Sequence, residues 1–180
     1  MGKQTVENAS REINSRIVEI FRVNLGFCIY EGIDPNLYSY LSCGISQGPI
    51  REDEIVLFQS NDILKNTEVE GLYQKLGLKR PSAEHAIRFC NQRRDLPRRD
   101  EQITFYLRPE DFEGSLKSKQ CVATLWRDTV YPYNSRRLDK EGIDGDKAWD
   151  RGRLFAGVSE VGTIFYSSPL SSRLAKFNKS

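Results

Sequence analysis

The chain has 180 residues, of which 38% are hydrophobic, 11% aromatic and 29% charged, and its formal net charge is +2. This length suits a single domain with a real hydrophobic core, and the composition is typical of a folded protein rather than a disordered one. Because the net charge is small, no global field drives binding to nucleic acid or membranes, and such a role would need a local charged patch.

Residues 1–168 are expected to form one domain, followed by a mobile tail at 169–180 that is rich in Ser, Lys and Asn. No run approaches the roughly 20 apolar residues of a membrane helix, and residues 1–20 lack the continuous apolar stretch of a signal peptide. We therefore predict a protein of the cytoplasm or the plastid stroma, with no membrane partner. The sequence leaves the oligomeric state undetermined.

The cysteines are far apart in the chain and form no CxxC pair, at Cys28, Cys43, Cys90 and Cys121. This spacing argues against a zinc knuckle and gives no disulfide framework. In a reducing compartment such residues are most often buried thiols that pack as small hydrophobic side chains.

Residues 5–22 show a helical spacing of apolar side chains. These recur mostly three or four positions apart, at Val6, Ala9, Ile13, Ile17, Ile20 and Phe21. The spacing predicts an amphipathic helix with one face against the core, and Gly26 ends it. Short strands are expected at 27–30 and 55–58, separated by a turn at 34–36 and an irregular stretch rich in Gly, Ser and Pro.

Residues 67–92 predict two short helices. Thr67 and Glu70 have the spacing of a capping box, and Gly77 stands where a left-handed cap would end the first helix. Pro81 and Ser82 begin the second, whose inner face is expected to contain Ala83, Ala86, Ile87 and Cys90. Two short helices joined by a glycine turn resemble a helix-turn-helix, although such pairs are also common packing units.

Basic residues concentrate in the same region. Between Lys79 and Arg99 the chain carries seven basic and two acidic residues, a local balance of +5. Such a patch could neutralise phosphates of DNA or RNA, and we expect the second helix to present base-reading side chains outward. The predicted nucleic-acid interface contains His85, Arg88, Gln92, Arg93, Arg94, Arg98 and Arg99. The alternative is a solvated arginine-rich loop, and a metal site is not expected from a single histidine.

The second half of the chain is predicted to form β-strands. Apolar runs at 103–107, 121–126, 129–133, 154–158 and 163–166 are separated by turns containing Gly, Pro or Asp, and 140–146 is turn-like. Together with the earlier segments they predict an α+β fold. We expect an antiparallel sheet of five or more strands with an N-terminal amphipathic helix packed on it and two short helices in the middle.

A series of short motifs in residues 112–166 resembles the motifs of a known protein family. The series contains Phe112-Glu113-Gly114, Cys121-Val122, the tyrosines of 131–133, Asp150-Arg151-Gly152-Arg153, and Gly157-Val158 with Gly162 to Phe165. In kind and order these motifs resemble the C-terminal half of the T-type (CpcT/CpeT) phycobiliprotein chromophore lyases, over about 55 residues. The resemblance implies a lipocalin-like β-barrel that holds a linear tetrapyrrole (bilin) and delivers it to a cysteine of an apo-phycobiliprotein subunit.

The resemblance also implies roles for single residues. A bilin carries two propionates on a long conjugated body, so its carrier needs arginines and aromatic walls. Asp150 and Arg151 would position and protonate the substrate, and the remaining ligand-binding residues would be Arg153, Tyr131, Tyr133, Trp149 and Cys121. The bilin would be a substrate rather than a tightly bound cofactor, and the bonding thiol would belong to the partner.

Simpler explanations stay open for the same residues. Asp150 and Arg151 could form a surface ion pair at a β-turn, and Cys121 could be a core thiol. Neither candidate site contains an obvious pair of nucleophile and base, so a non-enzymatic adaptor protein also fits the sequence.

Overall fold

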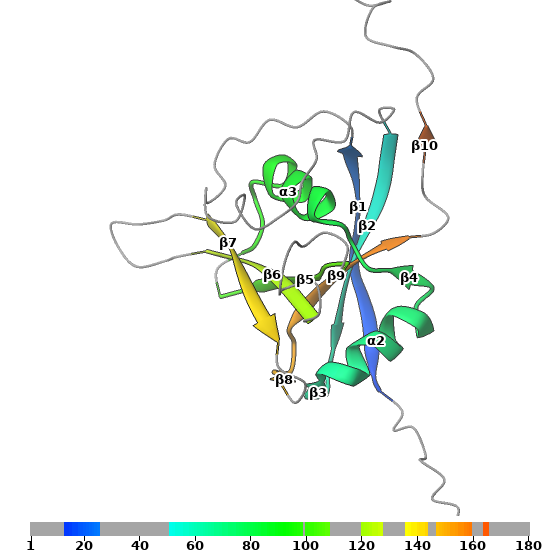
Figure 1. Cartoon of the computed structure of the whole chain (residues 1–180), viewed down its shortest axis with the longest axis vertical. Helices are drawn as coiled ribbons and strands as arrows, with labels where there is room; N and C mark the ends of the chain where they lie inside the picture. Colours follow the sequence, from blue (N-terminus) through cyan, green and yellow to red (C-terminus); the bar gives the residue numbers. More distant parts are fainter. Residues whose placement is uncertain are drawn as a thin grey trace, which may run out of the picture.

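The computed structural model describes residues 13–25, 51–98, 100–108, 120–127, 136–143, 147–159 and 164–165. This part of the chain has an α+β fold, in which a mixed sheet is combined with two helices (Figure 1). The elements are β1 (Ser15–Leu25), β2 (Arg51–Ser60), β3 (Leu64–Lys65), α2 (Asn66–Lys75), β4 (Leu78–Lys79), α3 (Ala83–Gln92), β5 (Gln102–Tyr106), β6 (Gln120–Arg127), β7 (Arg136–Ile143), β8 (Ala148–Trp149), β9 (Leu154–Ser159) and β10 (Ile164–Phe165).

The main sheet follows the order β1-β2-β9-β5-β6-β7, with β4 and β10 pairing at its sides and β3 pairing β8 separately. Its neighbours are antiparallel except for β5 and β9, which run parallel. The parallel pair arises because the chain passes through β6 and β7 before β9 returns beside β5. The predicted α+β sheet is therefore confirmed, but it is mixed rather than antiparallel throughout. Among the described strands the path ends at β1 and β7 and does not close into a barrel.

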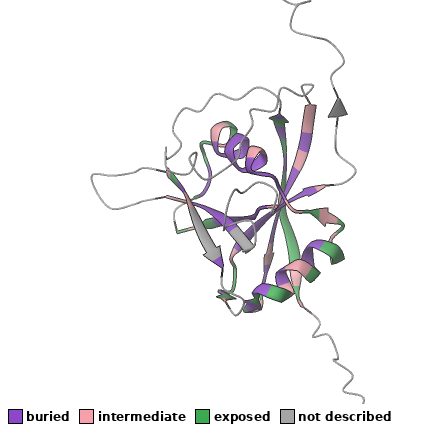
Figure 2. Ribbon diagram, viewed as in Figure 1, coloured by how far each residue is buried: buried purple, intermediate pink, exposed green. Residues whose placement is uncertain are grey.

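The predicted N-terminal helix is wrong for its described part, because β1 is a strand paired with β2 along its whole length. Near its end the side chains alternate in the manner of a strand, with Phe21 and Val23 buried and Arg22 exposed. Ile17 and Ile20, which gave the helical spacing, are 50% and 54% exposed. A register shift near Ile17 breaks the alternation that would have revealed the strand. In Figure 2, β1 changes from exposed to buried along its length.

The central strands are buried on both faces, because each helix covers a different side of the sheet. One core cluster combines α3 with residues such as Val23, Ile55 and Phe105. The other combines α2 with residues such as Phe58 and Phe155. Neighbouring residues of one strand thus enter different clusters, which explains the continuous apolar runs of β2, β5 and β9.

Three of the four sequence predictions for the two helices are confirmed. Gly77 has a φ of +63° after α2, and Ser82 caps α3 by accepting a hydrogen bond from the His85 backbone N–H at 3.3 Å. The predicted inner face of α3 is buried. The predicted capping box is wrong by two residues: the Lys65 N–H donates to Glu68 Oε2 at 2.7 Å, which places Thr67 inside the first turn.

Strands β2, β5, β6 and β9 confirm the predicted apolar runs, and β10 confirms the middle of the last one. The turn predicted at 140–146 is wrong for 140–143, because this segment continues β7 and pairs with β6. The strands predicted at 27–30 and 129–133, the Phe112 turn and the tail at 169–180 lie outside the described residues.

Candidate functional site

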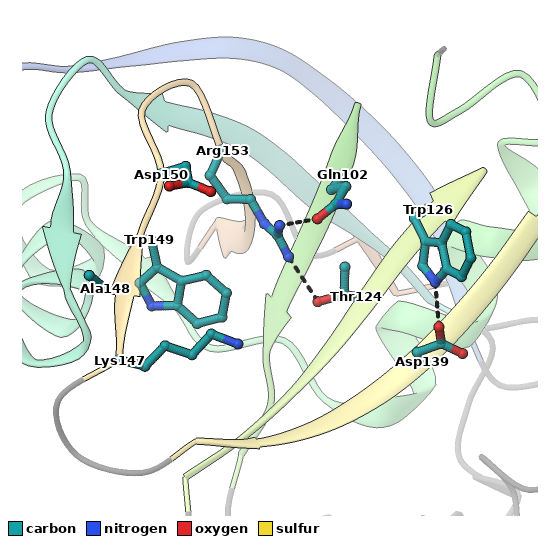
Figure 3. A pocket seen from close by; sticks show the side chains of 9 residues that line it. All are labelled: Gln102, Thr124, Trp126, Asp139, Lys147, Ala148, Trp149, Asp150 and Arg153. Atoms are coloured by element: carbon teal, nitrogen blue, oxygen red, sulfur yellow. Dashed lines mark hydrogen bonds between the residues drawn. The ribbon is translucent and has the colours of Figure 1, made fainter. Parts of the chain in front are cut away.

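A pocket of about 580 Å³ lies beside β5, β6 and β7 and the β8–β9 turn (Figure 3). It is lined by Gln102, Thr124, Trp126, Asp139, Lys147, Ala148, Trp149, Asp150 and Arg153. These residues come from strands whose register brings them together: Gln102 stands opposite Trp126, and Thr124 stands opposite Asp139. The pocket thus combines two indole rings, two cationic side chains and two carboxylates.

Arg153 is held across the sheet by three acceptors. Its Nε donates to Thr104 Oγ1 at 2.8 Å and its Nη2 to Thr124 Oγ1 at 3.2 Å, while Nη1 donates to Gln102 Oε1. The guanidinium carbon also lies 5.2 Å from the Trp149 ring centroid. Because its fork is engaged on β5 and β6, Arg153 fixes the pocket wall.

Trp149 forms the buried aromatic side of the pocket. Its Nε1 donates to the Tyr106 hydroxyl at 3.1 Å, and its ring makes an edge contact with Phe155 at 5.8 Å between centroids. Burial raises the pKa of the Tyr106 phenol to about 12. Lys147 Nζ lies 4.7 Å from the Trp149 ring centroid, so a cation sits against the aromatic face.

Trp126 and Asp139 form the opposite side, where the indole Nε1 donates to Asp139 Oδ2. Arg137 lies near the Trp126 ring, with its guanidinium carbon 5.6 Å from the centroid. The indole is only partly buried, so part of its surface faces solvent. This wall offers a flat apolar surface with a charge on either side.

The turn between β8 and β9 holds the predicted catalytic residues. The Arg153 N–H donates to the Asp150 carbonyl at 3.3 Å, and the Gly152 N–H donates to the Ser60 carbonyl at 3.0 Å. Gly152 has a φ of +75°, a backbone conformation that favours glycine at this position. Asp150 lines the pocket, whereas Arg151 is exposed on the turn and is not among the lining residues.

The structure therefore brings together Trp149, Asp150 and Arg153 of the predicted ligand site. Cys121 lies in β6, opposite Gly142, but its side chain is outside the described part, as are Tyr131 and Tyr133. Sequence reasoning missed Gln102, Thr104, Asp139 and Lys147 as site residues. Because side chains alternate along a strand, the predicted strand at 121–126 places Thr124 and Trp126 on one side, and this signal could have identified them.

The predicted nucleic-acid face of α3 does not form, because His85 and Arg88 are buried, at 3% and 9% exposure. His85 Nε2 lies 2.9 Å from Asp53 Oδ2. Gln92 is exposed but exchanges two hydrogen bonds with the Asn24 backbone. The expectation that these three side chains point outward together is wrong, because α3 packs against β1 and its residues His85 and Arg88 are buried.

The arginines after α3 are partly engaged. Arg93 donates to both Asp95 oxygens at 2.9 and 2.6 Å and lies 3.7 Å from the Phe21 ring centroid. The hydrogen bond from Arg93 lowers the pKa of Asp95 to about 2. Arg94 and Arg98 are exposed, and Arg99 lies outside the described residues. Only part of the predicted basic patch is therefore available on the surface that the structure describes.

No group of three or more His, Cys, Asp or Glu side chains that could hold a metal occurs within the described ranges. Those ranges also contain no helix with the length and apolar character to cross a membrane. Comparison with protein-family models, with curated proteins and with solved structures finds no match for this chain. Fold and site together define an α+β protein with an aromatic, charge-lined pocket at the side of a mixed sheet.

Proposed function

We propose that this protein binds a planar conjugated anion in the pocket between Trp126 and Trp149. The ligand class suggested by the resemblance is a bilin, and the activity is assistance in attaching that bilin to a cysteine of an apo-phycobiliprotein in the cytoplasm or the plastid stroma. The observation that carries the proposal is the meeting of both indoles with Lys147 and the Asp150 turn in one pocket.

The chemistry of the lining supports an extended aromatic ligand. Ligand pockets are typically about 300–1,000 Å³ and mostly apolar, with a few polar groups that fix orientation. Indole faces stack on conjugated rings, and a cation close to an indole can pair with a carboxylate of the ligand. Lys147 and the exposed Arg151 would meet the propionates, while Asp150 would accept hydrogen bonds from pyrrole N–H groups.

The engagement of Arg153 refines this proposal. Because its three donor nitrogens already meet acceptors on β5 and β6, its contribution is to hold the wall and the Trp149 ring in place. A lyase of this kind supplies position and protonation, since the attacking thiol comes from the acceptor protein. The pocket needs no nucleophile of its own under this proposal.

The proposal is tested by mixing the purified protein with a bilin and recording the visible spectrum. A bound bilin becomes more rigid and extended, so a shifted and sharpened band is expected. Lys147→Gln removes one charge-assisted contact and should weaken binding by roughly tenfold. Arg151→Lys should weaken binding less, because a point charge replaces the planar fork. The matched control is Lys75→Gln, an exposed lysine on α2 outside the pocket.

Two outcomes would contradict this proposal. One is a bilin spectrum that the protein leaves unchanged. The other is a shifted band of equal affinity in wild type and Lys147→Gln, which would place the bilin elsewhere. Transfer to an added apo-phycobiliprotein subunit, measured as a covalent coloured band after denaturation, separates a lyase from a non-enzymatic carrier or adaptor.

A second candidate is weak binding of DNA or RNA by the exposed arginines after α3. Arg94 and Arg98 are exposed four residues apart in this segment, which favours contact with phosphates rather than base reading. Changing both to Gln should abolish retention on heparin at low salt and leave the fold intact. Wild-type protein that flows through heparin at low salt would remove this candidate.

A further inference from the structure

A second pocket, of about 470 Å³, lies where α2, β4 and the start of α3 meet the ends of β2 and β9. It shares no lining residue with the aromatic pocket and has no part in the proposed bilin chemistry. Its lining consists of Arg51, Asp53, Glu70, Tyr73, Gln74, Leu78, Lys79, Arg80, His85, Arg108, Val158 and Ser159. We refer to it as the basic pocket.

Positive charge exceeds negative charge in the lining of the basic pocket. The cationic side chains are Arg51, Lys79, Arg80 and Arg108, and the carboxylates are Asp53 and Glu70. With His85 counted as neutral, the lining itself carries an excess of two positive charges, and Glu84, whose Oε2 lies 3.8 Å from Arg51 Nη2 just outside the lining, lowers the local excess to one. A phosphate monoester carries about −1.5 to −2 at neutral pH and has three acceptor oxygens, so it can contact several of these cations at once, which a single carboxylate cannot do as well.

A buried hydrogen-bond network fixes one side of the basic pocket. The Ser82 N–H lies 3.1 Å from His85 Nδ1, and since a backbone N–H can only donate, Nδ1 is the acceptor. The ring proton is therefore on Nε2, which donates to Asp53 Oδ2 at 2.9 Å. Asp53 in turn accepts from Arg51 Nε at 3.3 Å, and Arg51 Nη2 lies 3.8 Å from Glu84 Oε2, so these two carboxylates set the direction of the Arg51 guanidinium.

The same network excludes a hydrolytic triad, although Ser82 contacts His85 and His85 contacts Asp53. Ser82 Oγ lies 2.5 Å from His85 Nδ1, but it also caps α3 by accepting the His85 backbone N–H. Ser82 is buried and does not line the pocket, so a substrate there would not meet its hydroxyl. The three residues position Arg51 and do not form a nucleophile with its base.

Arg80 is held by an acidic residue that lies nearer to solvent. Its Nε donates to Glu70 Oε2 at 2.8 Å, and its Nη2 donates to the same oxygen. The Glu70 side chain is 40% exposed and that of Arg80 only 19%. Because the Glu70 carboxylate is partly exposed, water can solvate it when another anion displaces it, while Arg80 stays beside the pocket. An incoming anion would then take over the Arg80 fork.

We propose that the basic pocket binds the phosphate group of a small molecule, with Arg51 and Arg80 as its principal contacts. Phosphate oxygens match the planar guanidinium fork, and such charge-assisted bonds are the strongest hydrogen bonds that side chains make. Tyr73, Leu78 and Val158 supply an apolar wall for the organic part of a phosphomonoester. The phosphate can belong to free inorganic phosphate or to such an ester, and the two sources are separated by experiment.

The test is calorimetric titration of the full chain with inorganic phosphate, glycerol 3-phosphate and acetate at equal ionic strength. Saturable binding of a phosphate probe, with acetate at least tenfold weaker, is expected because the match depends on a doubly charged anion. Tighter binding of glycerol 3-phosphate than of inorganic phosphate would assign the site to an ester, and the reverse order would assign it to the free ion.

Three variants locate the site. Arg80→Gln should weaken phosphate binding by roughly tenfold or more, since a charge-assisted contact is lost. Glu70→Gln should strengthen it, because the competing carboxylate is neutralised while the arginine remains. Arg98→Gln, an exposed arginine outside the pocket, is the matched control and should bind as wild type does.

The Glu70 variant keeps the proposal falsifiable even if Arg80→Gln fails to fold, because it adds no cavity and removes only a partly exposed charge. Absence of saturable phosphate binding in wild type would overturn the proposal. So would acetate binding as tight as phosphate, or phosphate affinity that Glu70→Gln lowers or leaves unchanged.

Discussion

Substitution of Gly157 by alanine tests how closely α2 and β4 pack on the sheet. A Cβ added at Gly157 would lie 2.9 Å from Leu78 Cδ1, 3.0 Å from Leu78 Cβ and 3.1 Å from Tyr73 Cε1. The first atom can move, but Leu78 Cβ belongs to the paired strand β4. Tyr73 is anchored, because its hydroxyl donates to the Ala156 carbonyl at 2.6 Å. The added methyl group would therefore be too close to atoms of Leu78 and Tyr73 that are held in place.

The magnitude follows from two opposing effects. Forcing a methyl group into a packed site costs about 1–3 kcal/mol. Alanine also restricts the unfolded chain, which returns about 0.4–1 kcal/mol where the native backbone accepts it. We expect Gly157→Ala to lower the free energy of unfolding by about 1–2 kcal/mol, which corresponds to a fall in Tm of roughly 2–8 °C for a chain of this length.

The assay is urea unfolding followed by circular dichroism, with Gly71→Ala as the matched control. Gly71 lies in α2, and a Cβ added there would meet nothing within 4 Å, so alanine should stabilise the protein by about 0.5–1 kcal/mol. If Gly157→Ala were as stable as wild type, or if both glycine variants shifted the midpoint equally, the close packing of α2 and β4 on β9 would be refuted.

Three further predictions follow from burial and hydrogen bonding. Ile17→Asp should lower the free energy of unfolding by less than about 1 kcal/mol, because Ile17 is 50% exposed. Val23→Asp should lower it several times more, because Val23 is fully buried. Equal urea midpoints for the two variants would contradict the strand assignment of β1. Burial raises the pKa of Tyr106 from 10.0 to about 12, so stability should fall between pH 10 and 12, where the unfolded chain loses a proton that the folded chain keeps. Tyr106→Phe should reduce that fall. An unchanged dependence of stability on alkaline pH would show that Tyr106 is not responsible. Arg153→Lys should destabilise the fold by about 1–3 kcal/mol, because one amine cannot reach three acceptors on β5 and β6; thermal melting of the variant measures this, and an unchanged Tm would contradict it.

The parts of the fold that follow from local chemistry could be predicted from the sequence. Ser82 and Gly77 mark helix ends through their own backbone and side-chain preferences, and the apolar runs of β2 and β9 mark strands buried on both faces. The β1 segment was predicted as a helix because Ile13, Ile17 and Ile20 have a helical spacing. Its strand structure depends instead on pairing with β2, a distant part of the chain. Pairing between distant segments leaves no local signal.

The candidate site, too, could be predicted from the sequence only in part. Trp149, Asp150 and Arg153 are neighbours in sequence and could be grouped as a unit. Gln102 and Thr104 could not be added, because they reach Arg153 only through the parallel pairing of β5 with β9. The burial of His85 was equally hidden, because its partner Asp53 lies on another element.

The central claim, that the aromatic pocket binds a bilin, can be tested through the two tryptophans of the chain, because both of them line this pocket. A bilin bound between Trp126 and Trp149 would accept their excitation energy, so both indoles must be quenched if this pocket is occupied. We predict saturable quenching of both indoles, with the residual emission of Trp126→Phe quenched at the same bilin concentration as the wild type. Indole emission that stays unquenched while the visible bilin band shifts would place the ligand away from the pocket and contradict the claim.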